Sequence, residues 1–159
     1  MATNPAAALA KAPKLLWTDC GLAAWLARIK SSADARQRSD AGFWLEQTLF
    51  QTLDTWRALD SQRRKLHFWR DRAGHEVDFI LEEADKLVGL EIKAGSQVTT
   101  HDLIGIRVFR DALKGKASLV RGLVLHSGKS RPLDAQDTAL PWGWMVPAPR
   151  RLRLASLGW

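Results

Sequence analysis

The chain has 159 residues, of which 46% are hydrophobic and 26% charged, a composition that suits one globular domain with a buried core. Its formal charge of +7 favours a polyanionic partner, nucleic acid first and an anionic membrane second, although solubility alone would explain the same charge. Cys20 is the only cysteine, which excludes an internal disulfide and a Cys-rich zinc site and favours the cytoplasm. The sequence has no apolar run that could span a bilayer and no signal-peptide pattern, so a membrane role is not expected.

The N-terminal quarter of the chain reads as an appendage to the main domain. Residues 1–13 are rich in Ala with little patterning and are expected to form a flexible arm. Residues 14–40 are expected to link this arm to the domain through a short strand at 14–18 and a helix that Asp19 caps. Residues 31–40 are polar and are expected to form an exposed linker. Four apolar residues recur at helical spacing in this first helix: Leu22, Trp25, Leu26 and Ile29.

Residues 41–159 are expected to form the domain itself, beginning with a helix from Gly42 to Trp56. The apolar residues of this helix share one buried stripe: Leu45, Leu49, Leu53 and Trp56, widened by Phe43 and Phe50. Three strands separated by two turns are expected next: strands at 66–70, 76–81 and 87–93, and turns at 71–74 and 83–86.

A third helix is expected after these strands. Thr99 followed by Asp102 resembles a capping box at its start, and Gly115 can end it. Its inward-facing residues share helical spacing: Leu103, Ile106, Phe109 and Leu113. The remaining sequence predicts a strand at 122–126 and a last strand around 144–146.

The second and third strands predict a hairpin in a definite register. If they join through a tight turn within residues 83–86, residue 82 lies opposite residue 87. The register then pairs apolar residues on the side that faces the core: Val77 with Ile92, Phe79 with Leu90, and Leu81 with Val88. Because every pair on this side is apolar, the pattern supports the register.

The same register predicts a carboxylate pair on the other side of the hairpin. Asp78 lies opposite Glu91, with their Cβ atoms roughly 5 Å apart, and Glu76 lies opposite Lys93. Directly opposed carboxylates repel each other, which favours a cation between them. Neutralisation by Lys93 alone, or protonation of one carboxyl group, would also relieve the repulsion.

Glu46 favours the cation. It lies in the middle of the apolar arc of the Gly42–Trp56 helix, where an ionised carboxylate is rarely found without a partner. If this helix packs over the sheet, Glu46 can point toward Asp78 and Glu91. Carboxylates and water are the ligands that suit a hard dication, with Mg²⁺ the default.

The order of these residues resembles a known nuclease signature. Asp78, a hairpin and then Glu91-Ile92-Lys93 are similar to the D…ExK motif of the PD-(D/E)xK nuclease superfamily. The expected order of helix, three strands, helix and strand resembles the αβββαβ core of that superfamily. The resemblance implies an α/β (α+β) fold of restriction-endonuclease type, with a mixed central sheet flanked by helices.

A closer resemblance covers most of residues 14–147. Six motifs carry it: Lys14-Leu-Leu-Trp-Thr-Asp-Cys-Gly-Leu, Gly42-Phe-Trp-Leu-Glu-Gln, Phe68-Trp-Arg-Asp, Glu76-Val-Asp-Phe-Ile-Leu, Leu90-Glu-Ile-Lys-Ala-Gly and Gly122-Leu-Val-Leu-His. Together they resemble the C-terminal domain of unknown function 4143 of bacterial and archaeal AAA+ ATPases. In that family an ATPase domain and a winged-helix segment normally come first. The chain therefore resembles a detached or truncated C-terminal module, with 14–18 as a remnant of the linker into it.

The nuclease resemblance implies a role for each site residue. Asp78 and Glu91 would bind Mg²⁺ or Mn²⁺, with the Ile92 carbonyl as a further ligand, and the metal would polarise the phosphate and activate the attacking water. Lys93 would orient that water or stabilise charge on the phosphate. Glu46 would bind a second metal or hold a water. The expected substrate is DNA, with RNA less favoured.

Basic residues beside the first of the three strands and on the third helix could bind the nucleic-acid backbone without sequence preference. The candidates are Arg63, Arg64, Lys65, Arg107, Arg110 and Lys114. For each one alone, an ordinary solvated charge is the simpler interpretation.

A catalytically silent module for nucleic-acid or protein binding is the alternative to a nuclease, because function belongs to the site and not to the fold. ATP hydrolysis by this chain is excluded. Gly128-Lys129-Ser130 resembles the end of a P-loop, but position 123 is Leu where a Gly is needed, and Arg131-Pro132 follows instead of a helix. An ATPase acting in trans is left open as a partner.

Overall fold

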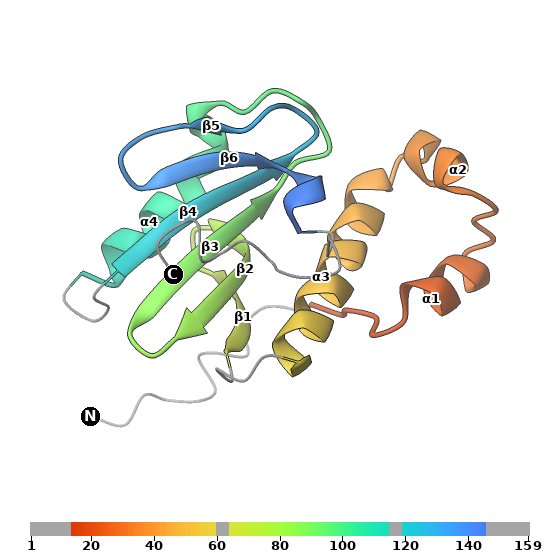
Figure 1. Cartoon of the computed structure of the whole chain (residues 1–159), viewed down its shortest axis with the longest axis horizontal. Coiled ribbons are helices and arrows are strands. Elements are labelled where there is room, and N and C mark those ends of the chain that lie inside the picture. The colour runs from red at the N-terminus through yellow and green to blue at the C-terminus, as the bar shows by residue number, and fades with distance from the viewer. Residues whose placement is uncertain (1–13, 60–63, 115–118, 146–159) are drawn as a thin grey trace.

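The computed structural model describes residues 14–59, 64–114 and 119–145, with the side chain of Leu119 left out (Figure 1). The elements in chain order are α1 (Cys20–Leu26), α2 (Ser32–Gln37), α3 (Ala41–Leu59), β1 (Lys65–Arg70), β2 (Glu76–Glu83), β3 (Lys86–Ile92), the 3-10 helix η2 (Thr100–Leu103), α4 (Ile104–Ala112), β4 (Leu119–His126), β5 (Arg131–Pro132), β6 (Asp137–Pro141) and the 3-10 helix η3 (Trp142–Trp144). The run from α3 to β4 has the predicted order of helix, three strands, helix and strand.

The strands form one mixed six-stranded sheet in the order β1-β2-β3-β4-β6-β5. β1, β2 and β3 are antiparallel neighbours along the chain, whereas β3 and β4 are parallel. A parallel pair needs a crossover connection, and η2 with α4 supplies it. β6 lies parallel to β4, and β5 pairs antiparallel with β6. The predicted α+β class with a mixed central sheet is confirmed.

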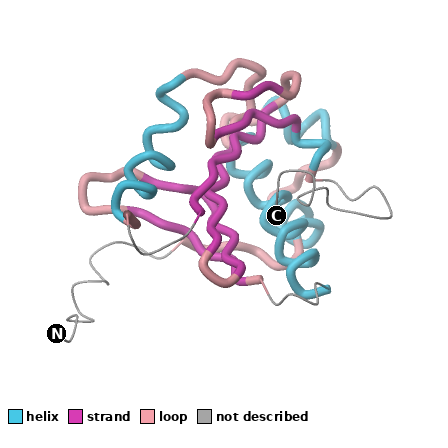
Figure 2. The backbone as a smooth tube through the Cα atoms, turned by 60° about the vertical axis from the view of Figure 1, so that its left-hand side comes forward, coloured by secondary structure: helices cyan, strands magenta, loops and turns pink. Residues whose placement is uncertain are grey.

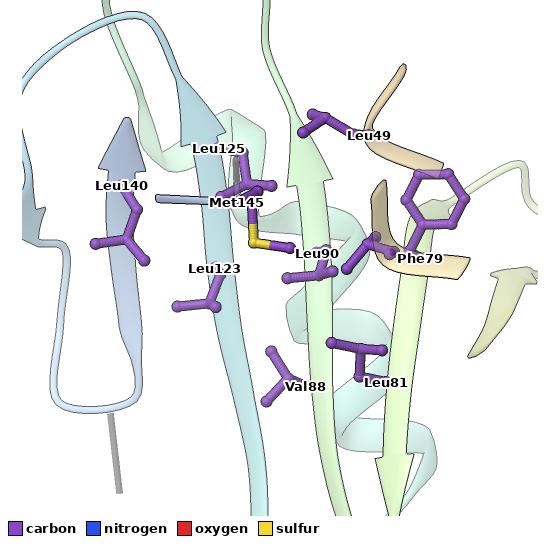
Figure 3. Packing of buried hydrophobic residues seen from close by; sticks show 10 residues of the cluster. Leu49, Phe79, Leu81, Val88, Leu90, Leu123, Leu125, Leu140 and Met145 are labelled. Atoms are coloured by element: carbon purple, nitrogen blue, oxygen red, sulfur yellow. The ribbon is translucent and has the colours of Figure 1, made fainter. Parts of the chain in front are cut away.

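Helices cover both faces of the sheet (Figure 2). On one face, Leu49 of α3 packs against Phe79 of β2 and Leu90 of β3 (Figure 3). Leu53 of α3 belongs to the same cluster. On the other face, Ile106 and further residues of α4 form a second cluster with residues of β2, β4 and β6. In Figure 1, α4 lies behind the sheet, and α1 and α2 lie on the side of α3 away from it. The central strands β2, β3 and β4 are therefore covered by helices on both faces, whereas β1 and β5 at the edges are largely exposed.

The hairpin register is confirmed over most of its length. Phe79 pairs with Leu90 and Leu81 with Val88, as predicted, and a two-residue turn at Ala84 and Asp85 joins the strands. Ala84 has φ 54°, the left-handed conformation that tight hairpin turns require.

One predicted apolar pair of the hairpin is wrong. Val77 packs in the cluster under α4, whereas Phe79 packs in the cluster under α3. The register of β2 against β1 shifts by one residue between His67 and Trp69, so the side-chain alternation of β2 is interrupted at this point. An irregularity of this kind depends on the neighbouring strand, which the alternation within β2 alone does not reveal.

Two predictions for the N-terminal segment are wrong. Residues 14–18 form no strand, and the expected linker at 31–40 contains α2, which Ser31 caps by accepting a hydrogen bond from the Asp34 amide. The predicted Asp19 cap of α1 is confirmed. The apolar stripe of α1 stays largely outside the core: Leu22 is 49% exposed, Trp25 73% and Leu26 54%, and Ile29 lies beyond the end of the helix.

The C-terminal strands also differ from expectation. Residues 142–144 form η3 instead of part of a strand, and residue 146 lies outside the described residues. β5 and β6 were not predicted, because β5 has only two residues and β6 begins with a charged residue, Asp137. Asp137 is fully buried and paired with Arg110 of α4, so a tertiary ion pair makes this polar start of β6 possible. The predicted end of the third helix at Gly115 also lies outside the described residues, whereas its capping-box start is confirmed.

Candidate functional site

Asp78 lies where the β2–β3 hairpin stops pairing regularly. The pairing ends at Phe79 opposite Leu90, one residue short of the predicted Asp78–Glu91 pair. Beyond this point Asp78 Oδ2 accepts a hydrogen bond of 2.8 Å from the Ile92 amide, so a side chain bridges the two strands. The close approach of α4 supports this end of β2, because a Cβ atom on Gly105 would collide with the carbonyl oxygen of Glu76. The carboxylate of Asp78 is therefore held in one orientation at the end of the hairpin.

The first group of charges at this point gathers around Lys14. Its Nζ forms an ion pair with Oε1 of Glu46 on α3, and it lies 3.3 Å from Oε1 of Glu76 and 3.8 Å from Oδ1 of Asp78. Arg70 of β1 pairs with the other carboxylate oxygen of Glu76. The predicted convergence of Glu46 with Asp78 is thus mediated by a lysine that sequence reasoning did not assign to the site.

Lys14 reaches the site from an irregular segment that side chains of α3 hold in place. Gln47 Oε1 accepts a hydrogen bond of 2.7 Å from the Trp17 amide, and Gln51 Oε1 accepts one of 3.3 Å from the Cys20 amide. The Cys20 thiol donates to the Gln47 carbonyl at 3.1 Å. Gln47 and Gln51 are one helical turn apart and so face the same side of α3. Within residues 14–18, the Gln47 side chain thus gives the Trp17 amide the acceptor that a neighbouring strand would have supplied.

The second group of charges gathers around Lys93, directly after β3. Lys93 Nζ lies 2.9 Å from Oε1 of Glu91 and 3.5 Å from Oδ1 of Asp102. The backbone of Lys93 is also bonded, since its amide donates to the Leu125 carbonyl at 2.8 Å and its carbonyl accepts from the Trp142 indole at 3.0 Å. Asp102 was predicted only as a helix cap, and its Oδ2 does accept from the Thr99 amide. The sequence showed no sign that its other oxygen would face Lys93.

Burial and mutual repulsion raise the pKa values of three carboxyl groups in this site. Burial, reinforced by the charge of Asp78, raises the pKa of Glu91 to about 7, against the opposing hydrogen bond from Lys93. Burial likewise raises the pKa of Asp78, although the bond from the Ile92 amide opposes the shift. Burial also raises the pKa of Glu46, and here the opposing group is Lys14. The lysines therefore do not fully compensate the burial of Glu46, Asp78 and Glu91.

The site carries more negative than positive charge. Five carboxylates face three cationic groups: Glu46, Glu76, Asp78, Glu91 and Asp102 against Lys14, Arg70 and Lys93. With every group ionised the formal charge is −2. This excess is equal to the charge of one divalent cation.

The oxygen atoms of these carboxylates and of the nearby backbone can be compared with the ligands that metal ions take in proteins. Within residues 14–59, 64–114 and 119–145, no group of three or more His, Cys, Asp or Glu side chains is arranged to hold a metal ion. Mg²⁺, however, is commonly bound by one or two carboxylates, with water and substrate phosphate completing its shell. Asp78 and Glu91, with the Ile92 carbonyl, are donors of that chemical type. The described residues thus contain donors of the type that Mg²⁺ takes, but no site that is built wholly from protein side chains.

The residues predicted to bind nucleic acid are paired with carboxylates. Four of the ion pairs have separations of 2.7 to 3.1 Å: Arg64 with Glu83, Lys65 with Glu82, Arg107 with Asp134, and Lys114 with Asp111. Arg110 pairs with the buried Asp137 and donates to the Val120 carbonyl, which gives it a structural role. Arg63 lies outside the described residues. Arg64 and Lys65 lie at β1, whereas the other three lie on or directly after α4.

The excess of basic residues lies mostly outside the part of the chain that the structure describes. The described residues hold 18 of the 24 Lys and Arg residues and 16 of the 17 Asp and Glu residues, which leaves a formal charge of +2 out of +7. Attraction of polyanions by the described part of the fold is therefore weaker than the total charge indicates. None of the described helices combines the length and the apolar character needed to cross a membrane.

Comparison with known proteins identifies one family. The model of a family described as a domain of unknown function, DUF4143, matches residues 41–145. This match begins with the first residue of α3 and ends directly after η3, so it contains the whole sheet and both helices that cover it. A search of curated proteins finds no match.

Proposed function

Since the chain belongs to the DUF4143 family, we propose that residues 41–145, which match the family, form a Mg²⁺-dependent nuclease-like domain of the PD-(D/E)xK type that acts on phosphodiester bonds of DNA. The observation that carries this proposal is the partly buried group of acids at the end of the β2–β3 hairpin. Burial and the charge of Asp78 raise the pKa of Glu91 to about 7, and with every group ionised the formal charge of the site is −2. Uncompensated acids of this kind are typical of functional sites.

The residues of the chain have distinct tasks in this proposal. Asp78, Glu91 and the Ile92 carbonyl would hold Mg²⁺, which when bound polarises the phosphate and lowers the pKa of the attacking water. Lys93 would orient that water or stabilise charge on the phosphate, and its bonded backbone keeps its position constant. Glu46 is paired with Lys14, so it acts through its charge at a distance from the reacting atoms.

Plasmid cleavage tests the proposal. Supercoiled DNA is incubated with the chain in Mg²⁺, in Mn²⁺ or in EDTA, and nicked and linear products are measured. We expect metal-dependent cleavage that Asp78→Ala abolishes. Asp111→Asn is the matched control, because it removes an exposed acid on α4 that pairs only with Lys114 among the contacts seen. Cleavage that persists in Asp78→Ala at the wild-type rate would show that another site, or a contaminant, is responsible.

A catalytically silent module for protein binding is the second candidate, and one observation favours it. Leu22, Trp25 and Leu26 of α1 are exposed, and exposed apolar residues that lie together mark contact surfaces. The basic residues predicted to bind nucleic acid are meanwhile paired with acids. In this case an ATPase acting in trans would be the partner. Trp25→Ser would then weaken partner binding, while Asp78→Ala would leave it unchanged.

A cytoplasmic location is proposed from the single cysteine alone.

A further inference from the structure

Lys93 has a backbone that the fold holds in place and a side chain that extends toward the group of acids. Its amide donates to the Leu125 carbonyl at 2.8 Å, and its carbonyl accepts from the Trp142 indole at 3.0 Å. These bonds fix where the side chain begins, but a lysine carries its charge at the end of a flexible stem. The side chain is 35% exposed, so packing alone does not hold it. The position of the ammonium group therefore depends on the acids around it.

Among the described residues, two acids contact the ammonium group of Lys93, and they come from different parts of the fold. Glu91 Oε1 lies 2.9 Å from Nζ, but Glu91 belongs to the same segment as Lys93, so this contact brings no second element to the lysine. Asp102 Oδ1 lies 3.5 Å from Nζ and belongs to η2, at the start of the crossover connection. The contact with Asp102 thus joins the lysine that follows β3 to a separate element.

The two oxygens of the Asp102 carboxylate have separate partners. Oδ2 accepts hydrogen bonds from the Thr99 amide at 2.7 Å and from the Thr99 hydroxyl at 3.0 Å. A capping box needs one oxygen for this purpose, which leaves Oδ1 for Lys93. The side chains of Val98 and Leu103, on either side of this turn, are buried in the cluster under α4. The carboxylate therefore meets Lys93 from a turn that the core holds in place.

We propose that Asp102 is the positioning residue of Lys93: one of its oxygens holds the ammonium group beside the acids at the end of the β2–β3 hairpin, while the other caps the crossover helix. This inference rests on the proposed function, in which Lys93 acts on the reacting groups. Asp102 does not touch those groups and acts only through the lysine. A misplacement of about 1 Å can slow an enzymatic reaction by about 100-fold, so loss of this one contact should be measurable.

One substitution separates the two tasks of Asp102. Asp102→Asn keeps an oxygen that can accept from the Thr99 amide but removes the charge that faces Lys93. Its melting temperature should stay close to that of the wild-type chain, while kcat for cleavage of supercoiled plasmid should fall by about 10-fold to 100-fold with little change in KM. Asp102→Glu, which keeps the charge, should recover most of this loss. Thr99→Ala is the matched control, because it removes the hydroxyl of the cap and leaves the carboxylate in place, and it should cleave like the wild-type chain.

A double variant shows whether Asp102 acts through Lys93. Once Lys93→Met has removed the ammonium group, adding Asp102→Asn should slow cleavage no further. Should Asp102→Asn fail to fold, Asp102→Ser replaces it in both chains, because a hydroxyl can also accept from the Thr99 amide.

Nuclear magnetic resonance of the Lys93 side chain gives a readout that is independent of cleavage. A lysine side chain that is held in one orientation gives separate signals for its two Hε protons, whereas free rotation averages them. We expect separate signals in the wild-type chain and in Thr99→Ala, and merged signals in Asp102→Asn. The absence of these signals in Lys93→Met assigns them to this lysine.

The possible results separate this inference from the proposed function. If the wild-type chain cleaves DNA and Asp102→Asn has the same kcat, the inference is overturned and the proposed function stands. A further loss of cleavage in the double variant would also overturn the inference, because Asp102 would then act by a route other than Lys93. No cleavage by the wild-type chain would contradict the proposed function. The Hε signals of Lys93 would then decide whether Asp102 holds the ammonium group, and signals that are the same with and without the Asp102 charge would overturn the inference.

Discussion

Lys93 and Lys14 bring their ammonium groups to the same group of carboxylates by different routes. Lys93 follows β3, so strand alternation and the hairpin register carry it to Glu91. Lys14 belongs to an irregular segment that reaches Glu46 because Gln47 and its neighbour one turn later bind the backbone of that segment. A residue can thus reach a site through the regular repeat of a strand, which can be read from the sequence. It can also reach the site through hydrogen bonds between distant segments, which cannot be read from the sequence.

The largest difference between the two lysines should appear in cleavage. Lys93→Met removes a group expected to stabilise the reacting phosphate, so cleavage should fall by about 100-fold to 1000-fold. The fold should survive, because the bonds of the Lys93 backbone to Leu125 and Trp142 do not involve the side chain. Plasmid cleavage and urea unfolding measure the two effects. A variant that cleaves normally would remove Lys93 from the proposed mechanism.

Lys14→Met should act mainly on stability. It leaves Glu46, whose side chain is 18% exposed, without its ion-pair partner, and the free energy of unfolding should fall by about 1–3 kcal/mol. Glu46→Gln in the same chain should restore most of the loss, because a neutral amide costs less to bury than a lone carboxylate. Urea unfolding in EDTA gives the double-mutant cycle. If the losses of the two single variants simply add, the ion pair contributes nothing.

The stability of the chain should depend on pH through Glu91, the acid that pairs with Lys93. Glu91 has a pKa of about 7 in the folded chain against an ordinary value of 4.5, so the folded chain binds its proton more tightly than the unfolded chain does. The contribution of Glu91 to stability should therefore decrease as the pH rises from about 4.5 to about 7, and then level off. Glu91→Gln should remove this decrease. Urea unfolding between pH 5 and pH 8 measures it, and identical curves for both chains would contradict the raised pKa.

The smallest effect should come from removing the hydrogen bond that Gln47 of α3 makes to the segment carrying Lys14. Gln47→Ala removes the acceptor of the Trp17 amide and should lower the free energy of unfolding by about 1 kcal/mol. Hydrogen exchange at the Trp17 amide should become faster. Thr52→Ala serves as the control, because its hydroxyl bonds only within α3, to the Thr48 carbonyl. Unchanged exchange at Trp17 in Gln47→Ala would show that the segment is held by other contacts.

Short-range patterns were sufficient for much of the central fold. The apolar stripe of α3, the capping box at Thr99 and the register of the β2–β3 hairpin each depend on residues close together in the chain. The repeats of helix and strand, about 3.6 and 2 residues, can be recognised within such short stretches of sequence. α2 was missed even though Ser31 caps it, because its six residues contain no buried apolar stripe from which a helix could be inferred.

The order of elements from α3 to β4 and the hairpin that carries Asp78 and Glu91 were readable from the sequence, as was the position of Lys93 two residues after Glu91. The contacts of Lys14 with Glu46 and of Asp102 with Lys93, and the buried Asp137 at the start of β6, became visible only in the folded structure. The first set follows from the repeating geometry of the backbone. The second set depends on contacts between segments far apart in the chain. A charged residue forms an ion pair only with a group that the fold brings within a few ångströms, and the sequence around the residue does not identify that group.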